Sequence, residues 1–258
     1  MSVVFENVTV CFGARMALRD MSARFAAGAV TGIVGPNGAG KTTALRAALG
    51  LHPCMAGSIR ILNKALSDWP RLALARAAAY LPQDGEAKWP MLARDVAMLG
   101  RMPHRAAFAA PSRADFKAVD DALARCDARD FADRRMDALS AGERARVLFA
   151  RALATGAPVL LADEPGAFLD PSHQLRLMEL LAEEARRGTV VAVTMHDLPL
   201  AARHCDEIIV LQEGRVAADG PPDAALSDEA LARVFSIVAQ RVPAADGGRD
   251  VLASFRRI

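Results

Sequence analysis

Short apolar segments alternate with helical patterns along most of the chain. The segments predicted as strands are residues 30–34, 57–62, 159–162, 189–194 and 208–211. Near-continuous apolar strands separated by helices are typical of a parallel sheet that is covered on both faces. The pattern therefore predicts an α/β fold.

The helices between these strands are predicted at residues 43–49, 144–154 and 171–187. Gly50 and Gly188 follow the first and the last of them, and a glycine just past the last helical residue is a common helix end. Glu213-Gly214 is predicted to close a hairpin between the last strand and residues 215–217.

Three regions depart from this alternation. The N-terminal stretch has a period of two, which predicts a half-exposed strand with Val4, Glu6, Val8 and Val10 opposite Phe5, Asn7 and Thr9. Residues 90–154 have a helical pattern with no convincing strand, so a helical block is expected to interrupt the sheet. Residues 244–250 are predicted to begin a flexible tail.

The strand predicted at residues 30–34 is followed by a glycine-rich segment that fits the pattern G-x-x-x-x-G-K-[ST]. This segment, hereafter the P-loop, consists of Gly35, Pro36, Asn37, Gly38, Ala39, Gly40, Lys41, Thr42 and Thr43. In a strand–loop–helix setting, such residues let successive backbone N–H groups and a helix N-terminus surround phosphate oxygens. Lys41 is expected to neutralise the β- and γ-phosphates and Thr42 to ligate Mg²⁺.

A P-loop alone is compatible with a kinase, a GTPase or an ATPase. The strand at 159–162 ends in Asp163 and Glu164, and at a strand's C-terminal edge these carboxylates are expected to reach Mg²⁺ and to polarise an attacking water, respectively. The alternative interpretation is an acidic pair that caps the segment after Pro165.

Leu139–Glu143, hereafter the signature segment, precedes the helical run 144–154. Ser140 and Glu143 form the S-x-x-E pattern of a capping box, so the simplest interpretation is a helix start. A capped helix start is also an anion site, so both interpretations can hold.

The order of these motifs, together with Gln83, Asp170 and His196, closely resembles the ATP-binding subunit of ABC transporters. The resemblance runs from Phe5 to about Val238. It implies a P-loop NTPase fold, with a RecA-like core, an antiparallel β element and an inserted α-helical subdomain. The implied single domain has its core at about 1–88 and 156–240, the helical subdomain at about 89–155 and a tail at about 241–258.

The resemblance also assigns roles to residues outside the P-loop. Phe12 matches an aromatic residue that stacks on adenine, with an ordinary core or turn phenylalanine as the alternative. Gln83 matches a glutamine that senses Mg²⁺ and the membrane partner, and a solvent-exposed glutamine is its alternative. His196 matches a histidine that contacts the γ-phosphate. Asp170 matches the D-loop aspartate and also fits a helix N-cap, because Pro171 follows it.

In this family the signature segment of one subunit closes over the ATP held by the P-loop of another. For this chain the segment supplies Ser140, Ala141, Gly142 and Glu143. The resemblance therefore implies a head-to-tail homodimer with two ATP molecules, in which Glu164 activates water and the closing motion drives a membrane partner. Ala141 stands where glycine is usual, and Phe168 is bulkier than the D-loop residue of most relatives.

The charge and composition of the chain limit the kinds of partner and location that are expected. The net charge of +2 is too balanced to indicate a nucleic-acid binder, and no apolar run approaches the about 20 residues of a membrane helix. The start of the chain carries the early acid Glu6 and no basic region, so a cytoplasmic protein is expected. The four cysteines are scattered, which predicts reduced, mostly buried thiols.

Residues 96–105 resemble a stretch of the ABC branch that imports iron–siderophores, haem and cobalamin, although Gly100 and Pro103 also fit a plain helix end. The implied partners are integral membrane permease subunits and, indirectly, a substrate-binding protein, with this chain peripheral on the cytoplasmic face of the membrane. Trp89-Pro90 falls where relatives receive the permease, with a buried core tryptophan as the alternative. The alternatives are a soluble ABC ATPase acting on DNA or ribosomes and a small-molecule kinase.

Overall fold

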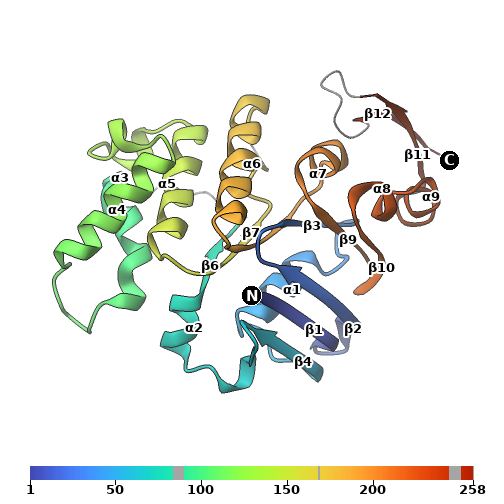
Figure 1. Ribbon diagram of the computed structural model, residues 1–258, viewed down its shortest axis with the longest axis horizontal. Helices are drawn as coiled ribbons and strands as arrows, with labels where there is room; N and C mark the ends of the chain where they lie inside the picture. Colours follow the sequence, from blue (N-terminus) through green and yellow to red (C-terminus); the bar gives the residue numbers. More distant parts are fainter. Residues whose placement is uncertain (84–89, 168, 244–250, 258) are drawn as a thin grey trace. The chain divides into compact units, whose positions relative to one another are not determined.

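The computed structural model describes residues 1–83, 90–167, 169–243 and 251–257. Two compact units are present, drawn in Figure 1: unit 1 comprises residues 1–69 and 185–258, and unit 2 comprises residues 70–184. The predicted core and helical-subdomain boundaries stay a prediction. Trp89 and Phe168 lie outside the described residues.

The N-terminal part of unit 1 is an antiparallel sheet of strand order β2-β1-β4-β5. Its strands are β1 (Ser2–Phe12), β2 (Arg15–Ala26), β4 (Ala56–Ile61) and β5 (Lys64–Ala65), followed by the 3₁₀ turn η1 (Leu66–Asp68). The rings of Phe5 and Phe25, whose centroids are 5.3 Å apart, anchor its buried face. The antiparallel β element implied by the family resemblance is therefore present.

The predicted alternation along β1 is wrong in detail. Phe5 is buried together with Val8 and Val10, whereas Val4 is only partly buried. The register with β2 shifts between Phe5 and Val8, and Asn7 has a φ of 49°. Such an irregularity adds residues to one strand and moves the following side chains to the other face, so a strict period of two fails across it.

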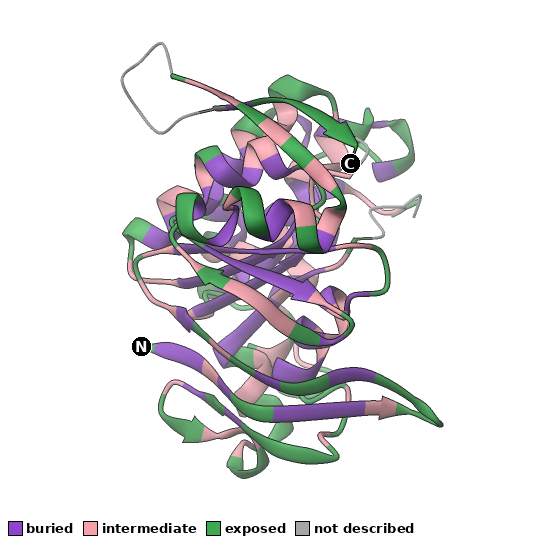
Figure 2. Ribbon diagram, turned by 90° about the vertical axis from the view of Figure 1, so that its right-hand side faces the viewer, coloured by how far each residue is buried: buried purple, intermediate pink, exposed green. Residues whose placement is uncertain are grey.

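The second sheet region of unit 1 carries the parallel strands. Their order is β10-β9-β3-β8, and β3 pairs in parallel with both β8 and β9. The strands are β3 (Val30–Val34), β8 (Val190–Thr194), β9 (Glu207–Gln212) and β10 (Arg215–Gly220). β3 and β8 are buried along their whole length (Figure 2), as expected for strands covered on both faces. The strands predicted at 30–34, 189–194 and 208–211 and the Glu213-Gly214 hairpin are confirmed. The strand predicted at 57–62 is present as β4, but it pairs antiparallel with β1 and does not join the parallel strands.

The helices of unit 1 are α1 (Lys41–Ala48), α7 (Leu198–His204), α8 (Pro222–Ala225) and α9 (Asp228–Phe235). A C-terminal hairpin of β11 (Ile237–Val242) and β12 (Val251–Arg257) was not expected from the sequence, and β12 contacts α7. The predicted flexible segment 244–250 lies outside the described residues.

Unit 2 contains one pair of parallel strands, β6 (Ala78–Leu81) and β7 (Val159–Asp163), in which Leu81 pairs with Ala162. Its helical elements are α2 (Arg71–Ala77), α3 (Ala93–Met98), η2 (Leu99–His104), α4 (Arg113–Arg125), η3 (Arg129–Phe131), η4 (Met136–Ala138), α5 (Ala141–Ala154) and most of α6 (Pro171–Arg186). Residues 90–154 hold helical elements and the isolated bridge Leu92–Arg135, in agreement with their helical pattern.

The segment 96–105 does more than end a helix. The α-helix stops at Met98, but the chain continues as the 3₁₀ element η2 through Gly100 and Pro103. Gly100 has no room for a side chain, because an added Cβ would clash with the carbonyl oxygen of Arg151 in α5. The interpretation of Gly100 as a helix stop is therefore incomplete, since the close packing of η2 on α5 also requires a glycine at this position.

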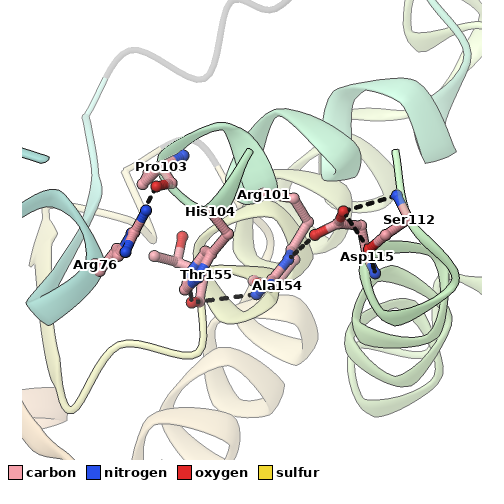
Figure 3. A network of polar contacts seen from close by, with 8 residues as sticks. All are labelled: Arg76, Arg101, Pro103, His104, Ser112, Asp115, Ala154 and Thr155. Atoms are coloured by element: carbon pink, nitrogen blue, oxygen red, sulfur yellow. Dashed lines mark hydrogen bonds and ion pairs between the residues drawn. The ribbon is translucent and has the colours of Figure 1, made fainter. Parts of the chain in front are cut away.

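A polar network ties η2 to the C-terminal end of α5 (Figure 3). Arg101 donates to the carbonyl oxygen of Ala154 at 2.8 Å, and Nε2 of His104 lies 2.8 Å from that of Thr155. Arg101 also pairs with the buried carboxylate of Asp115 at 2.9 Å. Hydrogen bonds from Ser112 and from Arg101 hold the pKa of Asp115 well below its usual range. The helix that begins at the signature segment is thus fixed at its far end.

Within the described ranges, no helix is both long and apolar enough to cross a membrane.

All four cysteines are free thiols, but only Cys126 and Cys205 are buried, and Cys11 and Cys54 are partly exposed. The expectation of mostly buried thiols therefore holds for two of the four, because Cys11 lies near the exposed end of β1 and Cys54 lies in the loop before β4.

Candidate nucleotide-binding and hydrolysis site

The P-loop connects β3 to α1 in unit 1, as predicted. The helix begins at Lys41, two residues earlier than expected from its apolar pattern, and Gly40 is its N-cap. The loop also closes a local turn, in which the N–H of Ala39 donates to the carbonyl oxygen of Pro36 at 3.1 Å. The N–H groups in the first turn of α1 therefore lie at the loop, where a phosphate would be bound.

Two P-loop positions require glycine for both conformation and space. Gly35 and Gly40 have φ values of 151° and 106°. A Cβ on Gly40 would lie 2.6 Å from the carbonyl oxygen of Ala17, and a Cβ on Gly35 would overlap the carbonyl oxygen of Leu211. The loop therefore packs so closely on the backbones of β2 and β9 that side chains at these two positions would displace it, and a backbone cradle of this shape fits a site for phosphate oxygens.

Lys41 lies across this cradle. The residue is only 6% exposed, and its Nζ donates to the carbonyl oxygens of Gly35 at 2.9 Å and Pro36 at 3.4 Å. A buried ammonium group needs such partners because its desolvation is costly. These two carbonyl oxygens therefore hold the ammonium group at the loop.

The β9–β10 hairpin supports the P-loop from behind, which sequence reasoning did not find. The N–H of Gly214 donates to the carbonyl oxygen of Ala39 at 3.0 Å, and the N–H of Arg19 donates to that of Gly214 at 2.8 Å. The sequence predicted the hairpin at Glu213-Gly214, but it did not indicate these contacts with residues 175 and 195 positions earlier in the chain.

Phe12 and His196 are the other predicted site residues of unit 1. Phe12 is 46% exposed at the end of β1, and its ring meets that of His52 edge-on with centroids 4.7 Å apart. The alternative of a core phenylalanine is therefore wrong, whereas that of a turn phenylalanine stays open because the turn at Gly13 and Ala14 follows directly. His196 follows β8 and is exposed, and the adjacent Asp197 caps α7 by accepting from the N–H of Leu200 at 2.8 Å.

In unit 2, the parallel pairing of β6 and β7 brings together residues about 80 positions apart. Gln83 follows β6, and Asp163 and Glu164 come at the end of β7. Nε2 of Gln83 donates to Oε2 of Glu164 at 2.6 Å. We call Gln83, Asp163, Glu164 and Tyr80 the carboxylate edge. Gln83 is exposed, but it also binds the carboxylate that the sequence assigned to hydrolysis.

The two carboxylates of this edge have different surroundings. Asp163 is fully buried and accepts a hydrogen bond of 2.9 Å from the hydroxyl of Tyr80. Glu164 is partly exposed and has a φ of 45°, which is uncommon for a residue with a side chain. One carboxylate is thus fixed in the interior, whereas the other is turned outward by a strained backbone. Tyr80 was missed because β6 follows an alanine-rich helix without an obvious boundary.

The signature segment forms a helix start, as predicted. Oγ of Ser140 accepts from the N–H of Glu143 at 3.2 Å, and Oε2 of Glu143 accepts from the N–H of Ser140 at 2.7 Å. The hydrogen bond from the backbone of Ser140 is the main cause that lowers the pKa of Glu143. Ala141 is the first residue of α5 and is exposed, so its methyl group is accommodated in the described structure.

Asp170 caps α6 and lies close to the signature segment. Its carboxylate accepts from the backbone N–H of His173 at 3.0 Å and from the hydroxyl of Ser172 at 2.8 Å. These bonds, with the side chain of His173, hold its pKa well below the usual range. The imidazole of His173 lies against Gly142, a neighbour that sequence reasoning missed.

Solved structures define the class of protein to which this fold belongs. An ABC transporter in an inward-facing conformation matches with a TM-score of 0.85 over 100% of this chain and 97% of that chain, at 23% identity. A dimeric post-hydrolysis state of the ATP-binding cassette MJ0796, bound to ADP and Pi, matches with a TM-score of 0.72 over 85% of this chain and 98% of that chain, at 27% identity. The fold is that of an ATP-binding cassette.

Sequence comparisons give the family. The ABC transporter family matches residues 18–167, more than half of the chain. The hemin import ATP-binding protein HmuV of Rhodococcus jostii is 43% identical over 89% of this chain and 78% of its own length. The cobalamin import ATP-binding protein BtuD of Halobacterium salinarum is 42% identical over 84% of this chain and 54% of its own length. The chain belongs to the ABC transporter family, and it is one of the family's ATPases.

Proposed function

We propose that the chain is the ATP-hydrolysing subunit of a membrane importer for a metal chelate such as haem, an iron–siderophore or cobalamin. The observation that carries this proposal is the 43% identity over 89% of the chain with an ATP-binding protein named for hemin import. Relatives named for hemin and for cobalamin import are almost equally similar, so the proposal names the chemical class of the cargo.

In this proposal the P-loop binds the phosphates of ATP. The positive φ values of Gly35 and Gly40 and the placement of the buried Lys41 support this role. Phe12 stacks on the adenine, which is consistent with its exposed ring, and His196 contacts the γ-phosphate from the end of β8.

Magnesium would be held by Thr42, Asp163 and Gln83. Their hydroxyl, carboxylate and amide oxygens are the hard donors that Mg²⁺ prefers. The amide nitrogen of Gln83 is used by Glu164, so its oxygen is the end suited to a cation. Within the part of the chain that is described, no cluster of three His, Cys, Asp or Glu residues could hold a metal ion. The ion would neutralise phosphate charge.

Hydrolysis is assigned to Glu164 as the general base. Its partly exposed carboxylate accepts a hydrogen bond from Gln83 at 2.6 Å, and this contact orients the group. The hydroxyl of Tyr80 holds the carboxylate of the neighbouring Asp163 in place. Because Asp163 ends β7 and Glu164 follows it directly, the backbone sets the spacing of the metal-binding residue and the base.

The working assembly is a head-to-tail homodimer. Ser140 caps α5, and Ala141, Gly142 and Glu143 form its first turn with N–H groups suited to an anion, while Asp170 caps α6 nearby. The chain carries one P-loop and one signature segment, so a site that needs both from facing subunits requires two copies. The dimeric MJ0796 cassette is a solved precedent for this fold.

Permease subunits are the proposed membrane partners, with a substrate-binding protein acting indirectly and the chain peripheral on the cytoplasmic face. The test is a pull-down from gently solubilised native membranes, followed by mass spectrometry. A stoichiometric multi-span protein is the expected result, and its presence allows hemin uptake to be measured in proteoliposomes. Uptake should stop with Glu164→Gln. Recovery of only soluble, DNA-linked or ribosomal partners would contradict the importer.

A further inference from the structure

We propose that His173 is a positioning residue that holds the first turn of α5 against Asp170. The signature segment and the start of α6 would then keep one arrangement throughout ATP hydrolysis. This consequence for hydrolysis rests on the proposed function, whereas the placement of His173 does not. His173 belongs to none of the motifs that the sequence identifies.

One edge of the imidazole faces Asp170. Nδ1 lies 2.8 Å from both Oδ1 and Oδ2 of that carboxylate. The N-cap of α6 needs only the backbone N–H of His173, which donates to Oδ1 at 3.0 Å and which any residue except proline would supply. The side chain therefore makes a contact that helix capping does not require.

The opposite edge of the imidazole faces Gly142. A Cβ built on Gly142 would lie 2.5 Å from Nε2 of His173, and it would lie still closer to Cδ2. Gly142 is buried, so the ring occupies the space beside its backbone. The ring thus spans from the Asp170 carboxylate to the first turn of α5.

The two helices do not close up completely beside the ring. A cavity of about 180 Å³ lies between α5 and α6, and its wall combines apolar side chains such as Phe149 and Leu177 with the charged Arg146 and Arg176. Loss of the imidazole would enlarge the cavity and release the start of α5 on that side.

This release matters because the capping box acts only within α5. The bonds between Ser140 and Glu143 fix the local backbone of the first turn. They do not set the place of that turn relative to α6. Small displacements of positioning groups are costly in catalysis, about a hundredfold for 1 Å in unfavourable cases.

Three substitutions separate the two edges of the ring. His173→Asn keeps an amide at the position of Nδ1, whereas His173→Gln keeps one at the position of Nε2, and His173→Ala keeps neither. Leu175→Ala is the matched control, because Leu175 is on the same helix and is 45% exposed. All variants are made in the full chain.

Two measurements are made on each variant. The first is amide hydrogen exchange at residues 140–143 without nucleotide, and the second is kcat and KM for ATP hydrolysis. We expect His173→Ala to accelerate exchange in this turn and to lower kcat about tenfold, with KM for ATP and the melting temperature nearly unchanged. Asn and Gln should each recover part of the loss, and the control should resemble the wild type.

Unchanged exchange in His173→Ala would overturn the proposal. So would faster exchange with normal kcat, full recovery by Asn alone, or a joint loss of kcat, ATP binding and melting temperature. A wild-type protein with no ATPase activity would instead contradict the proposed function. The exchange measurement would then still decide whether His173 positions α5.

Discussion

The P-loop of unit 1 and the carboxylate edge of unit 2 are built in opposite ways. The P-loop is a contiguous segment whose shape depends on the backbone, with glycines at positive φ and carbonyl oxygens that hold Lys41. The carboxylate edge is assembled from two strands about 80 residues apart, and side chains make its contacts.

This difference predicts how each region fails. A backbone cradle is damaged when atoms are added, because a new Cβ meets carbonyl oxygens that have nowhere to move. An edge held by side chains is damaged when atoms are removed, because a buried carboxylate loses its donor. The first kind of damage should affect nucleotide binding, and the second should affect the chemical step.

The largest expected effect is at Glu164. Glu164→Gln keeps the size of the side chain but removes the base, so kcat should fall by about 10³ while the affinity for ATP is kept. Steady-state ATPase assays together with equilibrium binding of a fluorescent ATP analogue measure the two quantities. A normal kcat in Glu164→Gln would show that the base lies elsewhere.

A substitution at Gly40 tests the cradle. Gly40→Ala places a Cβ 2.6 Å from the carbonyl oxygen of Ala17 at a φ of 106°, so ATP affinity should fall about 30-fold. Calorimetric titration with ATP gives the affinity. Gly28→Ala is the control, because Gly28 has a φ of 85° but no atoms within 4 Å of an added Cβ. Equal losses in both variants would mean that strain, and not the clash, is responsible.

How much of each region can be predicted from the sequence follows from the same difference. The P-loop residues are adjacent in the chain, so one motif with its strand and helix predicts the cradle. The strand β7 and its two carboxylates were also predicted, because the apolar run ends at Asp163.

The features that the sequence did not predict depend on strand pairing and on the packing of distant segments. β6 follows the alanine-rich helix α2 directly, so its propensity resembles a continued helix and Tyr80 was not placed beside Asp163. The contact of His173 with Gly142 needs the packing of α5 on α6, and the support of the P-loop by Gly214 needs the closure of a distant hairpin. Along β1, the register shift before Val8 defeated a strict period of two.

Removal of the Tyr80 hydroxyl tests the carboxylate edge with a smaller expected effect. Tyr80→Phe leaves the ring but removes one hydrogen-bond donor to the buried Asp163, at a cost of about 1–2 kcal/mol, so kcat should fall about tenfold. ATP affinity should stay within about twofold when measured without Mg²⁺, because the P-loop is unchanged. A loss of affinity in the absence of Mg²⁺, with kcat preserved, would reverse the proposed division between the two regions.

The smallest expected effect is at Phe12, where a side chain of unit 1 is assigned to binding alone. Phe12→Ala removes an exposed ring, so little stability should be lost, and the stacking energy of about 1 kcal/mol predicts a rise of about fivefold in KM for ATP. His52→Ala is the control, because His52 meets the same ring edge-on. If Phe12 stacks on adenine, Phe12→Trp should restore KM and His52→Ala should change it little. If the loss instead reflects the Phe12–His52 contact, both alanine variants should raise KM equally. In either case kcat should stay constant, because this ring belongs to the region that binds ATP and not to the edge that hydrolyses it.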